Sequence, residues 1–292
     1  MLADKLNETL DEWGVQRSQV LAVVTDNGSN MVKAVRVANE EPEDGDDEGE
    51  SDIDETDSEE AEETTEPEIE VDTNLYRFPC LAHTLQLVLK ELGKNQAYTN
   101  LVTKVRAVVR AVKISSVAQE KLIAACGQTV IKDCTTRWTS ILLVVDRLLA
   151  IRPQLEEVLR EMKIDSLTNS EWARLSDIQK LLAPFKSQTD SLQTDTLSLS
   201  YVIPSLLELT LHLQDPSLPV SYSNPLLQSL RSHFAMFLDP LSTNFNALPA
   251  AACYMDPTVS AAMMREDMAP LLNAAKHYIK AQVCSSYFCE SL

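Results

Sequence analysis

The chain has 292 residues, which is enough for one large domain or two small ones with a proper hydrophobic core. Aromatic residues make up 5% and glycines number six, a composition that favours helices over an all-β architecture. The formal charge of −19 comes from one segment, because residues 40–72 hold 20 Asp or Glu and no Lys or Arg. The remainder is close to neutral, which neither requires nor excludes a nucleic-acid partner.

Cysteine usage and the N-terminal sequence predict an intracellular, soluble protein. The six cysteines are scattered and form no CxxC pair, so they are expected to be reduced and mostly buried in cores. The first residues lack the basic-then-apolar pattern of a signal peptide. No apolar run approaches the roughly 20 residues that are needed to span a bilayer, so no membrane partner is expected.

The first forty residues predict a fragment of an α/β domain. A helix is expected over residues 3–13, with Leu6, Leu10 and Trp13 on one apolar face. The apolar run 20–24 is typical of a strand that is buried on both faces. A turn over Asp26-Asn27-Gly28 follows, and then a short helix with Ser29 as its N-cap.

The acidic segment, residues 39–73, is predicted to be a disordered insertion. Its carboxylates, with almost no large apolar residues, cannot bury enough surface to offset the entropy cost of ordering. The segment either is simply solvated or competes with DNA for basic surface or binds a basic partner.

After this insertion the pattern is almost entirely helical. Helices are expected over 81–92 and 98–113, with a short strand or an extended link at 130–131 and a kink at Pro153. The later helices are expected to include 198–213, 225–238 and 259–283, with loops at 215–225 and 239–257. Trp172 lies on an apolar stripe and is predicted to be a core residue.

Five motifs, in this order along the chain, closely resemble those of the hAT transposase superfamily, especially its host-domesticated zinc finger BED-type group. They cover residues 24–31 (VTDNGSNM), 80–88 (CLAHTLQLV), 136–140 (TRWTS), 196–204 (TLSLSYVIP) and 237–240 (FLDP). Each is weak alone, and the five together are fairly specific.

The resemblance implies an α/β, mostly α, fold: a partial ribonuclease-H-like core interrupted by a large helical insertion domain. The expected parts are a core fragment (1–38), the acidic insertion (39–73), a continuation of the core with the start of the helical insertion (74–137), and the helical insertion itself (138–292). In the family, three carboxylates hold two Mg²⁺ or Mn²⁺ ions for phosphoryl transfer on DNA, since these ions favour hard oxygen ligands.

Asp26 matches the second of these carboxylates, whereas the first and third are not found in this sequence. Glu266 and Glu290 are the only late glutamates, and neither lies in a recognisable context. The zinc finger and the dimerisation segment of the family are also not found. One carboxylate cannot hold a metal pair, so no metal and no catalysis are expected.

Each of the remaining candidate residues has two possible interpretations. Asp26 is either an ancestral metal ligand or only a turn residue. Cys80 and His83 are either half of a zinc site, which has no second pair, or a buried cysteine and a helix-start histidine. The resemblance implies that this element lies near the DNA in hAT enzymes, so His83 is also a candidate for nucleic-acid contact.

Arg137 and Trp138 either bind phosphate and stack on a base, or cap a helix and pack a domain junction. A basic face of Lys104, Arg106, Arg110 and Lys113 is a further candidate for DNA contact.

The function predicted from the sequence is that of a transposase-derived, catalytically inactive nuclear protein, which binds DNA or protein partners. One alternative is a fragment of an active hAT transposase, and another is a helical interaction scaffold with no nucleic-acid role. A truncated core also predicts that residues 1–38 are less stable than residues 138–292.

Overall fold

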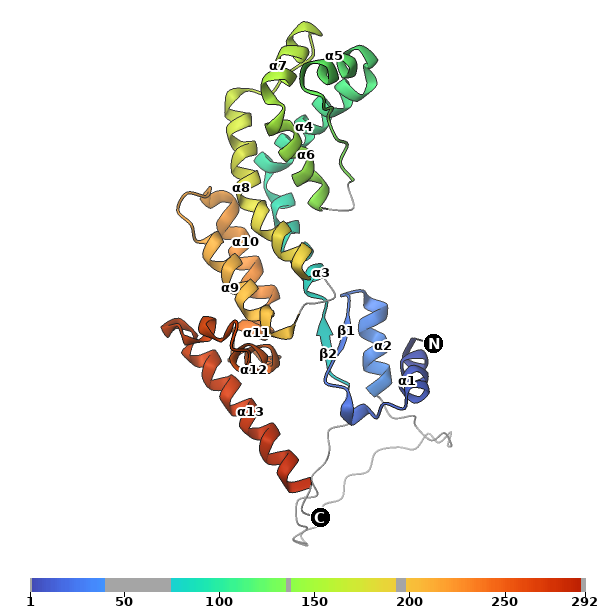
Figure 1. The fold of residues 1–292 in the computed structure, drawn as a ribbon, viewed down its shortest axis with the longest axis vertical. Coiled ribbons are helices and arrows are strands. Elements are labelled where there is room, and N and C mark those ends of the chain that lie inside the picture. Colours follow the sequence, from blue (N-terminus) through green and yellow to red (C-terminus); the bar gives the residue numbers. More distant parts are fainter. Residues whose placement is uncertain (1, 40–74, 135–137, 193–197, 290–292) are drawn as a thin grey trace, which may run out of the picture. The chain divides into compact units, whose positions relative to one another are not determined.

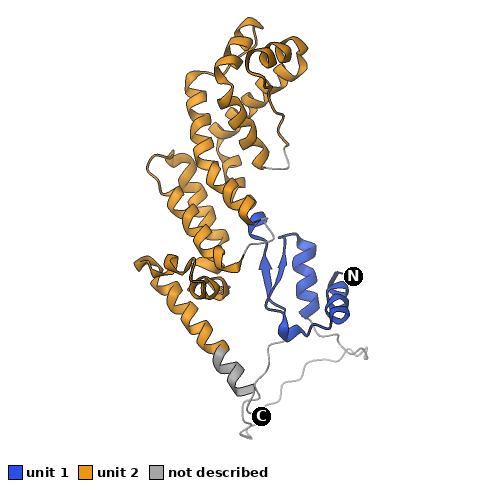
Figure 2. Cartoon of the chain, viewed as in Figure 1, with its two compact units in different colours: residues 1–83 blue, residues 84–292 orange. Residues whose placement is uncertain are grey.

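The computed structural model describes residues 2–39, 75–134, 138–192 and 198–289, and the side chains as far as residue 282. The chain divides into two compact units, residues 1–83 and residues 84–292 (Figure 2). The acidic insertion and Arg137 lie outside the described residues, so the predictions made for them have no structural counterpart here. No helix of the described part is long and apolar enough to cross a membrane.

The first unit is a small α/β arrangement (Figure 1). Its elements are α1 (Leu2–Trp13), a 3-10 turn η1 (Arg17–Gln19), β1 (Val23–Thr25), α2 (Ser29–Asn39) and β2 (Arg77–Pro79). The two strands pair in parallel with Val24 opposite Phe78. The predicted helix over 3–13, the strand and the helix from Ser29 are therefore confirmed, although the strand is shorter than expected.

The core of this unit is small. Ala3, Val35, Ala38 and Leu75 are buried together, and Leu6, Leu10, Val20 and Val23 pack against them. Two sequence-based expectations are wrong here. Trp13 is 72% exposed rather than part of the apolar face, and the strand is not covered on both faces, since Leu21 is 61% and Val24 is 66% exposed.

The two ends of the acidic insertion are held together by one side chain. The Asn39 amide donates a hydrogen bond to the Leu75 carbonyl (3.0 Å) and accepts one from the Leu75 N–H (2.7 Å). The end of α2 and the residue that leads toward β2 are thus joined by two hydrogen bonds.

The second unit is built of helices, and α3 (Leu81–Leu89) crosses the boundary between the units. The other elements are η2 (Lys90–Lys94), α4 (Gln96–Ile114), α5 (Ser116–Cys126), α6 (Trp138–Ala150), α7 (Arg152–Glu161), α8 (Asn169–Leu192), η3 (Leu199–Tyr201), α9 (Val202–Leu213), α10 (Val220–His233), α11 (Ala235–Leu238), α12 (Leu248–Met255), η4 (Ser260–Met264), η5 (Glu266–Met268) and α13 (Ala269–Cys289).

The apolar stripes read from the sequence are the buried faces of these helices. On α4, the stripe Leu101, Val105, Val108 and Val112 is at most 3% exposed, and Trp172 on α8 is 1% exposed, as predicted. The expected kink at Pro153 is a break between α6 and α7 at Ile151, with the proline in the first turn of α7, where its missing N–H costs nothing. Gly127 ends α5 with a φ of 69°, a conformation that favours glycine.

Two helices are absent from the sequence-based expectations. Residues 116–126 form α5, and residues 248–255, predicted to belong to a loop, form α12. The ribonuclease-H-like core is supported only at the coarser level of a mostly helical chain with one two-stranded parallel sheet among the described residues.

Candidate functional site

The Asp26 turn lies directly after β1 and is held by its own polar groups. The exposed Asp26 carboxylate accepts a hydrogen bond from the Gly28 N–H (3.0 Å). Arg77, on β2, donates to the Thr25 hydroxyl (2.8 Å), the Asp26 carbonyl (2.6 Å) and the Asn27 side chain (2.7 Å). The turn is therefore built around a guanidinium that sequence reasoning did not single out.

The turn supplies one carboxylate, that of Asp26, whereas a two-metal centre is held by several. Within the described ranges, no three His, Cys, Asp or Glu side chains come together in a way that could hold a metal ion. The cation that serves the turn is Arg77, and Asp26 is engaged as a turn residue. No chemical step that depends on a metal pair can be derived from these residues.

Cys80 and His83 lie where β2 gives way to α3. The Cys80 N–H donates to the Thr25 carbonyl (2.6 Å), so Cys80 extends the strand pairing, and both side chains are half-buried. The described residues bring no further pair of ligands to these two side chains.

Trp138 begins α6 and follows a loop that is closed at its base. The Ser140 hydroxyl accepts a hydrogen bond from the Cys134 N–H (2.9 Å) and donates one to the Cys134 carbonyl (2.7 Å). The indole Nε1 of Trp138 is covered and has no hydrogen-bond partner among the described residues, although the residue is half-exposed overall. His83 belongs to the first unit and Trp138 to the second.

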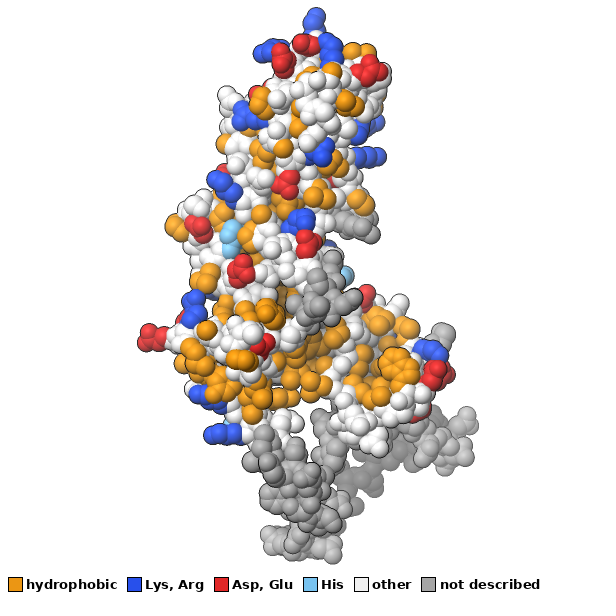
Figure 3. Space-filling model, viewed as in Figure 1, with side chains coloured by type: hydrophobic (Ala, Val, Ile, Leu, Met, Phe, Trp, Pro, Cys, Tyr) orange, Lys and Arg blue, Asp and Glu red, His pale blue; other side chains and the backbone are white. Residues whose placement is uncertain are grey.

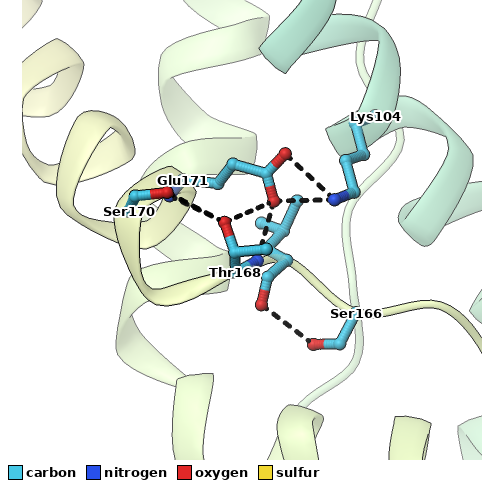
Figure 4. Close-up of polar contacts among 6 residues, drawn as sticks. Lys104, Ser166, Thr168, Ser170 and Glu171 are labelled. Carbon is cyan, nitrogen blue, oxygen red and sulfur yellow. Dashed lines mark hydrogen bonds and ion pairs between the residues drawn. The ribbon is translucent and has the colours of Figure 1, made fainter.

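The predicted basic face of α4 is present in part, because two of its four residues form ion pairs. Lys104 contacts both carboxylate oxygens of Glu171 (2.9 and 2.7 Å) and thereby ties α4 to the start of α8 (Figure 4). Glu171 also accepts hydrogen bonds from the Thr168 N–H (2.7 Å) and hydroxyl (3.0 Å). These contacts, with the Lys104 hydrogen bond as the largest cause, lower the pKa of Glu171 below its ordinary value of 4.5.

Arg106 is the second paired residue of the face, and its partner is Asp133, on the extended segment between α5 and α6. Arg110 and Lys113 are exposed and form no ion pair with described residues. Lys132, next to Asp133, is also exposed. We call Arg106, Arg110, Lys113 and Lys132 the α4 basic face.

The charge of the chain is concentrated around this face. Residues 90–150 contain ten Lys or Arg and four Asp or Glu, whereas residues 151–292 contain ten and fifteen. Figure 3 shows positive side chains spread over the end of the helical unit that holds α4–α7. The net positive charge of the helical unit therefore lies on the stretch from η2 to α6.

The opposite end of the helical unit carries a groove and apolar surface. A cavity of about 350 Å³ lies among α9, α10, α11 and the start of α13, with Leu207, Leu238, Met268 and Leu271 in its lining and Arg231 at its edge. Hydrophobic side chains gather over α11, α12 and the start of α13 on the face shown in Figure 3.

Comparison with known proteins identifies the class of the helical unit. Residues 78–181, from β2 into α8, match the model of the ZBED1 RNase-like helical domain. The chain is similar to this helical domain over the matched range, which contains the whole α4 basic face.

A curated relative extends the match. The human zinc finger BED domain-containing protein 4 is 26% identical over 133 residues, which cover 43% of this chain and 11% of that protein. The chain is therefore a relative of the hAT-derived, zinc finger BED-type proteins, as its five motifs predicted. It spans about a tenth of the length of that relative.

Proposed function

We propose that this protein is a hAT-derived, catalytically inactive nuclear protein that binds DNA through the α4 basic face. The observation that carries the proposal is the coincidence of the positive region with the domain that matches the ZBED1 RNase-like helical domain. Lys and Arg side chains on one helix face bind phosphates and release counterions, a contribution that is independent of base sequence.

We propose the lack of catalysis from the groups that surround Asp26. Asp26 is bonded within its own turn and Arg77 supplies the positive charge there, which does not suit a metal pair. The competing proposal, a fragment of an active transposase, requires two further carboxylates. Flanking sequence that encodes an Asp-bearing strand before this chain and a Glu-bearing helix after it would support that alternative.

DNA binding is tested by fluorescence anisotropy with a labelled duplex. The variant Arg110→Glu/Lys113→Glu reverses two exposed charges of the face, and Arg231→Glu/Lys280→Glu applies the same change of charge to exposed residues at the other end of the unit. We expect the first variant to bind more weakly and to lower the slope of log affinity against log salt by about two. Equal weakening by both variants would count against this face.

A second candidate function is a protein-interaction scaffold, which is favoured by the groove beside α9–α11. Its lining combines apolar side chains with Arg231, Asp239 and Asp267, which suits a partner that inserts an apolar side chain. If the chain shows no salt-dependent affinity for DNA, this second function becomes the leading one.

A further inference from the structure

The Arg106–Asp133 pair lies where the segment between α5 and α6 crosses α4. The Arg106 Nε donates a hydrogen bond to Oδ2 of Asp133 (2.8 Å), and Nη2 lies 2.7 Å from the same oxygen as an ion-pair contact. The two side chains differ in exposure, since that of Arg106 is 44% exposed and that of Asp133 is 11% exposed.

This geometry leaves part of the guanidinium free. An arginine has five N–H donors in one rigid plane, and one of them, Nε–H, donates to Asp133. Because one hydrogen bond and one ion-pair contact to the same oxygen orient the plane, the donors of Nη1 have a defined direction. Arg106 is therefore an oriented donor group on a half-exposed side chain, unlike the unpaired Arg110 and Lys113.

Breaking the contact between Arg106 and Asp133 is energetically costly. Removing the partner of a largely buried carboxylate leaves an uncompensated charge, which is strongly destabilising. An incoming anion is thus expected to bind to the free donors of Arg106 while Asp133 stays in place. Replacement of Asp133 by the anion is the less favourable route.

Two other exposed cations are neighbours of this pair in the chain. Lys132 precedes Asp133 and is exposed, and Arg110 lies one helical turn after Arg106 on α4 and is also exposed. A phosphate next to Arg106 would meet oriented hydrogen-bond donors and additional positive charge. A backbone phosphate of a nucleic acid has the acceptor oxygens and the charge that such a corner recognises.

We propose that Asp133 is a positioning residue, which orients Arg106 to bind a backbone phosphate of nucleic acid at the corner formed by Arg106, Arg110 and Lys132. The inference rests on the proposed function, since it assigns a phosphate contact within the α4 basic face. In this role the negatively charged Asp133 side chain favours the binding of a nucleic acid, which is itself negatively charged.

The direction in which one substitution changes the affinity for DNA separates the positioning role from a purely electrostatic effect. Asp133→Asn removes a negative charge from a phosphate-binding face, so charge alone predicts tighter binding. Positioning predicts weaker binding, by about fivefold, because the amide holds the guanidinium less firmly. Glu161→Gln is the matched control, since it frees Lys121 from an exposed ion pair and makes the same change of charge.

The experiment measures the affinity of the whole chain for a labelled DNA duplex by anisotropy, with thermal melting of each variant as a check on folding. We expect Asp133→Asn and Arg106→Lys to bind several-fold more weakly and Glu161→Gln to bind as tightly as the wild type or more tightly. If Asp133→Asn fails to fold, Arg106→Lys carries the test alone, because it keeps the charge and loses the rigid fork.

Tighter binding by Asp133→Asn, equal to that of Glu161→Gln, would overturn the positioning role, as would wild-type affinity in Arg106→Lys. Both results leave the proposed function standing, because the wild-type chain still binds. A wild-type chain with no salt-dependent affinity for DNA would instead remove the proposed function itself.

Discussion

At the scale of single residues, side chains far apart in the sequence define the polar features of this protein. Arg77 holds the Asp26 turn, Asp133 holds Arg106, and Glu171 holds Lys104. Sequence reasoning found Asp26 and Arg106 through their motif and their helical spacing. It missed Arg77 and Asp133, because no local pattern indicates which residue a guanidinium will contact after a loop or another helix.

The Lys104–Glu171 contact gives a prediction about pH. Glu171→Gln removes the ion pair and weakens the hydrogen bonds to Thr168, so the variant should melt at a lower temperature near neutral pH. The pKa of Glu171 is lowered in the folded state, so its stabilising contribution is present above the ordinary value of 4.5 and is lost as the pH falls through the lowered value.

Thermal melting as a function of pH checks this. The difference between wild type and variant should shrink below the ordinary glutamate pKa, and Glu156→Gln, which breaks an exposed pair with Arg152, should have little effect at any pH. A difference between wild type and Glu171→Gln that stays constant down to the lowest pH would contradict the assignment.

At the scale of elements, the helices that were predicted are those with an apolar stripe at helical spacing. The stripe on α4 and the Trp172 stripe on α8 are both buried. The missed helices lack such a stripe. In α5 only Ala118 and Leu122 are buried, while Val117 and Ile123 are exposed, and α12 consists largely of alanine after Pro249. Their burial depends on neighbours that the local sequence does not reveal.

The stripe on α8 predicts the cost of a cavity. Leu175 is 0% exposed, so Leu175→Ala should destabilise the helical unit by about 2–5 kcal/mol. Leu143 on α6 is 45% exposed, and Leu143→Ala should have a far smaller effect. Chemical denaturation followed by far-UV circular dichroism measures the free energy of unfolding of each variant. An equal decrease in the two variants would show that Leu175 on α8 is not a core residue.

At the scale of the whole molecule, the two units differ in how much apolar surface they bury. The unit of residues 1–83 has a two-stranded parallel sheet whose Val24 is 66% exposed, although parallel strands are normally covered on both faces. The helical unit buries entire helix faces and holds most of the buried side chains. The continuous apolar run 20–24 predicted the strand, whereas its exposure could not be foreseen from the sequence.

This difference predicts the order of proteolysis. Under limiting protease, cleavage within residues 1–38 should precede cleavage within residues 138–292, since local opening is easier where few apolar contacts are formed. Mass spectrometry of the fragments over time gives the order. Equal resistance of the two ranges would show that the small unit is more stable than its core indicates.

The central claim is that DNA lies on the α4 basic face, and cross-linking tests it most directly. The chain is cross-linked to a DNA duplex, digested, and the modified peptides are identified by mass spectrometry. We predict that the cross-links fall within α4 and the segment 128–134 and are lost on addition of salt. Cross-links concentrated in α13 or in residues 1–39, or a pattern that salt leaves unchanged, would contradict the account.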